Sequence, residues 1–193
     1  MSTWFRARQI VWATVLCVLT PVLIMLTAGA DLPLPFKPPL AIPVRVAPQV
    51  AIMVAFGCGL IIASRRRAEA VASRPVHMLE LMTVVGLAGL TAATCAALEA
   101  FALSPFGYAA ARDAIGFTGL LLIGARFNSR LATVVPASVA VFMVLFARSL
   151  DSEPERWAWS VADAQNCISW WWATGFFVVG IATHALSSTR LLN

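Results

Sequence analysis

Long apolar stretches separated by short charged breaks are the feature that most restricts what this chain can fold into. Residues 10–30 carry no charge and are long enough to cross the hydrocarbon core of a bilayer, which takes about 20 apolar residues as a helix. Further stretches follow at approximately residues 48–64, 79–98, 108–126, 131–147 and 166–187. We therefore predict an all-α fold: a polytopic integral membrane protein with six transmembrane helices, in a single transmembrane domain over residues 1–193.

The composition agrees with this prediction. Hydrophobic residues make up 60% of the chain and charged residues only 12%, which is about half the charged fraction of a soluble domain. So many apolar side chains cannot all be buried in one small core, and some must face lipid. The net charge of +5 does not indicate nucleic-acid binding, because the charges lie in short breaks and form no continuous basic face.

The distribution of basic residues predicts the orientation. With the amino terminus in the cytoplasm, nine of the 14 Lys and Arg residues fall on the inner side, as the positive-inside rule requires. Both termini are then predicted to be cytoplasmic.

Two breaks on the inner side are basic. The first contains Arg65, Arg66, Arg67, Arg74 and His77, and the second contains Arg126, Asn128 and Arg130. The arginines of the first break either only fix the topology and meet anionic headgroups, or form a docking element. Glu69 lies four positions after Arg65 and could brace a short helix there.

Four ionisable residues lie close to or within the predicted spans: Glu80, Glu99, Arg112 and Asp113. An ionisable residue inside a membrane is a functional candidate by default. Arg112 and Asp113 are sequence neighbours, so we expect them to point in different directions on a helix. Glu99 and Arg112 flank a turn and could pair across it; the alternative is that these helix-end charges lie among the headgroups.

Five of the seven tryptophans gather before and at the start of the last stretch. They are Trp157, Trp159, Trp170, Trp171 and Trp172. Tryptophan favours the headgroup boundary, because its ring is apolar and its N–H needs a partner. We predict that they are interfacial, either as a plain aromatic belt or as the flanks of a partly re-entrant segment.

Small residues predict close helix packing within the bundle. They recur at three- or four-residue spacing in two stretches, at Gly86, Gly89, Ala93, Ala96, Ala97 and Ala100 and again at Gly116 and Gly119. Residues 31–48 hold six of the 11 prolines and are expected to form an extended strap, either a simple linker or a lid.

The sequence gives little support for catalysis. It contains no HExxH, GxSxG or GxxxxGK[ST] motif, so the familiar zinc-protease, serine-hydrolase and ATP-binding signatures are missing. We predict no catalytic, metal-binding or cofactor-binding residue in this chain. An intramembrane enzyme using Glu80, Glu99 or His77 would lack nucleophile–base spacing. The four cysteines lack metal-ligand spacing, and pairing of Cys95 with Cys167 stays open.

The segment RDAIGFTGLLLIGARFNSRLATVVPASVAVFMVLFAR, followed by ERWAWSVADA and a final apolar helix, resembles small actinobacterial permease subunits of ATP-binding cassette (ABC) transporters. The resemblance covers roughly the last half of the chain. The residues that carry it are Arg112, Gly119-Leu120-Leu121, Gly124-Ala125-Arg126, Pro136 and Trp157-Ala158-Trp159. Ser160 and Asp113 depart from the pattern, in which proline and a neutral polar residue are expected.

The resemblance implies a non-catalytic permease subunit of an ABC-2-like exporter in a bacterial plasma membrane, moving a hydrophobic or amphipathic substrate. A separate ATPase, which holds ATP and Mg, would dock on the inner loop at residues 64–80, with residues 126–130 as a second contact. A second membrane subunit, identical or different, would complete the path. The alternative is a stand-alone small membrane protein, such as an immunity or assembly factor, without transport activity.

Overall fold

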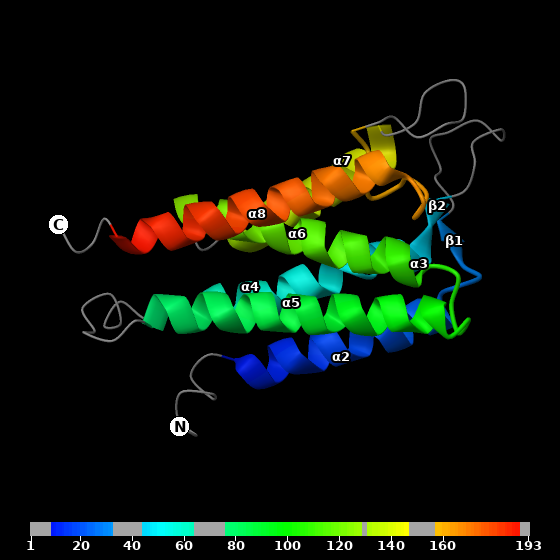
Figure 1. Ribbon diagram of the computed structural model, residues 1–193, viewed down its shortest axis with the longest axis horizontal. Helices are drawn as coiled ribbons and strands as arrows, with labels where there is room; N and C mark the ends of the chain where they lie inside the picture. The colour runs from blue at the N-terminus through cyan, green and yellow to red at the C-terminus, as the bar shows by residue number, and fades with distance from the viewer. Residues whose placement is uncertain (1–8, 33–43, 64–75, 129–130, 147–156, 190–193) are drawn as a thin grey trace.

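The computed structural model describes residues 9–32, 44–63, 76–128, 131–146 and 157–189, which form a bundle of six helices (Figure 1). The helices are α2 (Ile10–Leu26), α4 (Ile52–Ala63), α5 (Val76–Ala100), α6 (Gly107–Phe127), α7 (Leu131–Phe146) and α8 (Cys167–Thr189). A single-turn helix, α3 (Val46–Gln49), leads into α4.

The predicted all-α fold with six helices is confirmed, and each helix overlaps one of the six predicted apolar stretches. The largest differences are at the end of α2, which stops at Leu26 because the chain turns at residues 27–29, and at the start of α4, which begins at Ile52 after the single-turn helix α3. By length and composition, two helical segments among the described residues can cross a membrane, Val46–Ala63 and Met78–Ala100. α2 and α7 are also apolar, but they have 17 and 16 residues.

α6 is the central helix of the bundle. It packs against α8, α5, α7 and α4, whereas α2 packs mainly against α4 and α5 at the edge (Figure 1). Fifteen of the 21 residues of α6 are buried, although this helix carries Arg112, Asp113 and Arg126. Only five of 17 residues are buried in α2 and four of 16 in α7, and neither helix carries a charge. The most charged helix therefore lies inside, and two uncharged helices lie outside.

Successive helices run in opposite directions, so the bundle has two ends (Figure 1). The terminal end is where α2 begins and α8 ends, and where α4 ends, α5 begins and α6 ends. The hairpin end is opposite. There β1 (Asp31–Leu32) pairs antiparallel with β2 (Val44–Arg45), with Asp31 opposite Arg45. The two ends of the predicted strap therefore meet in a hairpin, and residues 33–43 lie outside the described part of the chain.

The turn between α5 and α6 is tight because Gly107 lies directly against the end of α5. A Cβ at Gly107 would clash with the backbone oxygen of Cys95 and with Glu99. Tyr108 N donates a hydrogen bond to Glu99 Oε2 at 2.7 Å. This bond satisfies an amide in the first turn of α6 and places a carboxylate at the positive end of the helix dipole.

Two glycines bring the backbones of α6 and α8 into contact. A Cβ on Gly119 would lie 2.5 Å from the backbone of Phe176 and Phe177, and a Cβ on Gly180 would lie 2.5 Å from Gly119 O. The close packing predicted at Gly119 is therefore present, and its partner is α8.

The packing predicted for the small residues of α5 is wrong at Gly86 and Gly89. Nothing lies within 4 Å of a Cβ placed at either glycine, and both are exposed together with Ala93. Val84 and Ala88 are fully buried and take the inward side of α5. Val84 and Ala88 have larger apolar side chains than glycine, and these side chains fill the space between the helices.

Candidate functional site

Arg112 and Asp113 form a buried ion pair in α6, near the hairpin end. Both side chains have 0% exposure, and Arg112 Nε donates a hydrogen bond to Asp113 Oδ1 at 3.1 Å. The guanidinium also donates from Nη1 to Asp163 O (3.0 Å) and Ser169 Oγ (2.8 Å), and from Nη2 to Ala162 O (3.1 Å). One side chain of α6 therefore holds the segment before α8 and the first turn of α8.

The segment before α8, residues 157–166, is non-helical, yet most of its first half is buried. Ala158 and Trp159 have 0% exposure and Ser160 has 2%. Side chains from three helices satisfy its carbonyl groups: Gln49 Nε2 donates to Ser160 O (2.9 Å), Arg112 to Ala162 O and Asp163 O, and Trp170 Nε1 to Ala164 O (2.9 Å). Irregular backbone at membrane depth is tolerated where it is buried in protein, so this segment is compatible with the re-entrant alternative.

Trp159 packs the segment onto α6. A Cβ at Gly116 would clash with the six-membered ring of Trp159. The indole also lies against Phe117, with ring centroids 5.0 Å apart, and Phe176, at 6.4 Å. The ring therefore lies in the core of the bundle, because Gly116 leaves room for it on the surface of α6. The interfacial depth of Trp159 in a membrane stays a prediction.

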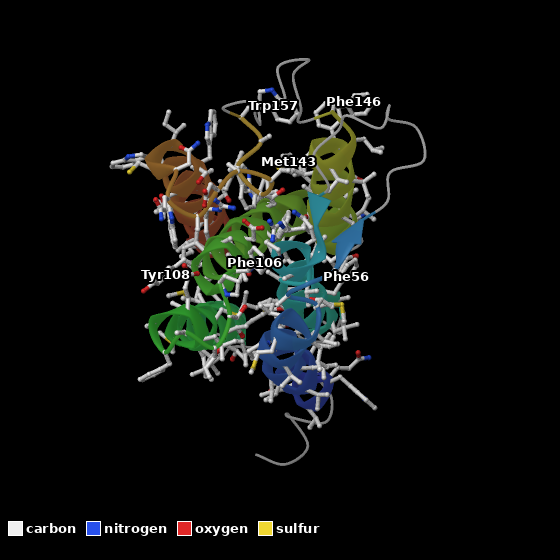
Figure 2. The ribbon with its side chains drawn as sticks, turned by 90° about the vertical axis from the view of Figure 1, so that its right-hand side faces the viewer. Phe56, Phe106, Tyr108, Met143, Phe146 and Trp157 are labelled. Carbon is white, nitrogen blue, oxygen red and sulfur yellow. The ribbon has the colours of Figure 1, made fainter. Side chains whose placement is uncertain are left out.

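The other four tryptophans lie towards the surface at the hairpin end. Trp157 is 36% exposed, Trp171 78% and Trp172 46%, and Trp170 is half-buried. Figure 2, which looks onto this end, labels Trp157 and Phe146, the last residue of α7, on the same side of the view. Both rings contact Phe142, at centroid distances of 5.5 and 4.9 Å. These positions suit rings that are apolar on one side and polar at the edge.

The structure corrects two predictions about the charged residues. Glu99 does not pair with Arg112, because its carboxylate binds the amide of Tyr108. Arg112 and Asp113 do not point apart, because the long arginine stem allows Nε to bend back to the neighbouring carboxylate. The remaining candidate, Glu80, is buried, at 2% exposure, near the start of α5.

The predicted inner-loop residues divide into described and undescribed ones. Arg65, Arg66, Arg67, Arg74 and Arg130 lie outside the described residues. His77 lies in the first turn of α5, and Arg126 and Asn128 are exposed at the end of α6. The start of α5 and the end of α6 share the terminal end (Figure 1).

The four cysteines are all free thiols. Cys95 is buried in α5 and Cys167 is exposed at the start of α8, so they do not form a disulfide. Within the described ranges, no group of three or more His, Cys, Asp and Glu side chains could hold a metal ion.

Sequence reasoning missed Gln49 and Ser169 as partners of this site. One signal was available for Ser169: Asn166 caps α8, accepting a hydrogen bond from Ile168 N at Oδ1 (3.0 Å), and asparagine is a common helix N-cap. It would have placed Ser169 in the first turn of α8, but no pattern shows that its hydroxyl faces Arg112.

Comparison with protein-family models, with curated proteins and with solved structures finds no match to this chain.

Proposed function

We propose that this chain is a non-catalytic membrane subunit of an ATP-driven transporter, with six helices crossing the bilayer and the terminal end in the cytoplasm. It works with a separate ABC ATPase and a second membrane subunit, and it exports a hydrophobic or amphipathic substrate. The observation that supports it most is the inverted distribution of apolar and charged side chains.

Large apolar side chains cover the outside of the bundle. Examples are Trp12 (65% exposed), Val18 (61%), Leu26 (75%), Val141 (58%) and Val178 (64%). Exposure to water costs roughly 25 cal/mol per Å² of apolar surface, and soluble monomers rarely expose more than a few hundred Å² in one patch. Lipid removes that cost, because its tails are as apolar as leucine.

The ATPase contact is supported by the character of the terminal end. α4 ends and α5 begins there, so the two described residues that flank the basic break, Ala63 and Val76, both lie at this end. Arg126 and Asn128 are exposed at the same end. A soluble partner on the cytoplasmic side could therefore reach both breaks together, as the resemblance implies.

Purification from membranes in mild detergent tests this proposal. We expect an ATPase to co-purify with the wild-type chain and to be lost when Arg65, Arg66 and Arg67 are all replaced by alanine. Arg45→Ala, at the hairpin end, is the matched control and should retain the ATPase. A stable chain that never binds a nucleotide-dependent partner would overturn the transporter proposal and favour the stand-alone role.

A further inference from the structure

The buried cluster around Arg112 leaves two polar atoms without partners. In the part of the chain that the structure describes, Asp113 Oδ2 and Trp159 Nε1 are buried and make no hydrogen bond. Buried polar atoms are normally paired, and an exception calls for an explanation. Both atoms belong to the contact between α6 and the segment at residues 157–166, because Trp159 packs on Gly116, one turn after Asp113.

The charge balance of the cluster depends on Asp113. Arg112 makes four hydrogen bonds, of which one goes to the carboxylate and three go to neutral oxygens, on Ala162, Asp163 and Ser169. The ionised pair is neutral overall. If the carboxylate were neutralised, the guanidinium would remain as an uncompensated charge with 0% exposure, and such a charge is strongly destabilising.

No other described charge can replace Asp113. On α5, the Glu99 carboxylate is bound to the amide of Tyr108, and Glu80 lies near the start of that helix at the opposite end. On β2, the Arg45 guanidinium lies 5.0 Å over the ring of Phe106.

The remaining neighbours of α6 add no competing charge. The exposed Asp163 contributes its backbone carbonyl to Arg112, while its carboxylate lies 3.5 Å from Gln165 N. On α8 the titratable groups are Cys167, exposed at its start, and His184, near its terminal end. The described residues of α4 and α7 carry no charged side chain.

We propose that Asp113 is a proton-binding site and that a proton bound there releases residues 158–166 from α6. Oδ2 takes the proton, since Oδ1 already accepts the Arg112 Nε–H. The proton comes from a hydronium ion in the water at the hairpin end: one O–H bond breaks in the hydronium, which becomes water, and one O–H bond forms at Oδ2, without any redox step. The cation left on Arg112 then favours hydration, which requires the three hydrogen bonds to the segment and to Ser169 to break. This inference concerns the isolated chain and does not depend on a transport partner.

The test introduces one cysteine into the segment and uses two cysteines that the chain already has as internal references. In a Ser160→Cys variant, a nearly isosteric change at a position with 2% exposure, alkylation by a maleimide is followed by mass spectrometry of peptides. The rate at position 160 is divided by that of the exposed Cys167 in the same molecules, which largely removes the pH dependence of the thiol chemistry. The buried Cys95 reports any global unfolding.

Between about pH 8 and about pH 5, we expect the rate ratio to rise reversibly by at least tenfold, the change that about 1.4 kcal/mol produces, while Cys95 stays unreactive. Adding Asp113→Asn should make the ratio high at both pH values. A ratio that does not change with pH, or a rise accompanied by labelling of Cys95, would overturn the proposal. So would an unchanged pH response in the Asn variant, and if that variant does not fold, the Ser160→Cys titration alone decides.

Discussion

Arg112 illustrates at the residue scale how one side chain can organise an otherwise irregular segment. Its side chain has 0% exposure and is neutralised by its sequence neighbour Asp113. Its other donors bind the backbone carbonyl groups of Ala162 and Asp163, in a segment that forms neither helix nor sheet. Breaking a buried ion pair costs more than replacing both partners with apolar groups, because a single survivor keeps an unpaired charge in a low-dielectric site.

This reasoning predicts that substitutions of Arg112 and Asp113 have non-additive effects on the free energy of unfolding. Arg112→Met should lower the free energy of unfolding by about 3–5 kcal/mol, whereas the double variant Arg112→Met/Asp113→Leu should lose clearly less than the sum of the two single variants. Denaturant unfolding in detergent micelles, followed by circular dichroism, measures both. Arg126→Met, at an exposed position, should stay within about 0.5 kcal/mol of wild type. Additive effects at positions 112 and 113 would contradict the pairing.

At the scale of elements, the crossing of α6 and α8 depends on the absence of side chains. Gly119 and Gly180 face each other across backbone contacts, and Gly116 receives the ring of Trp159 in the same way. Not every glycine has this role, because a Cβ added to Gly175 on α8 would have nothing within 4 Å. The difference lies in what faces each glycine, not in its spacing along the helix.

Matched alanine substitutions separate the two kinds of glycine. Gly119→Ala should lower the midpoint of thermal unfolding in detergent, because the added methyl overpacks a backbone contact at a cost of about 1–3 kcal/mol. Gly175→Ala should leave the midpoint unchanged or raise it, since alanine favours a helix by roughly 0.5–1 kcal/mol over glycine. Equal effects at both positions would show that α6 and α8 do not cross at Gly119.

The whole molecule places its most charged helix in the centre and exposes large apolar side chains on α2 and α7. In water this arrangement would leave the hydrophobic effect working against the fold. In a bilayer, a central helix that carries Arg112 and Asp113 keeps both charges away from lipid, as polar residues in membrane helices require.

A labelling experiment checks the proposed orientation of the molecule. Cys167 is exposed at the hairpin end, so a membrane-impermeant maleimide should label it in intact cells. In the variant Cys167→Ser/Asn128→Cys the reactive thiol moves to the terminal end, and labelling should require permeabilised cells. The reverse pattern would contradict a cytoplasmic terminal end, and equal labelling of both variants in intact cells would contradict membrane separation of the two ends.

Much of the helical architecture was predictable because it depends on local properties. The uninterrupted apolar stretch at residues 131–147 predicted a helix close to the observed one, Leu131–Phe146, since the charges of Arg130 and Arg148 mark where that stretch begins and ends. The sequence likewise predicted that Arg112 and Asp113 were the charges to examine. Their partners were not predictable. Every residue has a backbone carbonyl group, so the residue type at Ala162 does not indicate that its carbonyl binds Arg112.

The sequence by itself determined the number and approximate bounds of the helices, the overall apolar character and the positions of the candidate charges. The tertiary structure decided which helix is central, that Trp159 is buried, that Gly86 and Gly89 face outwards and that Glu99 caps α6 instead of binding Arg112. The physical reason is that helix formation follows from neighbouring residues. The burial and pairing of a side chain depend instead on which distant backbone lies against it, as α8 and the segment before it lie against α6.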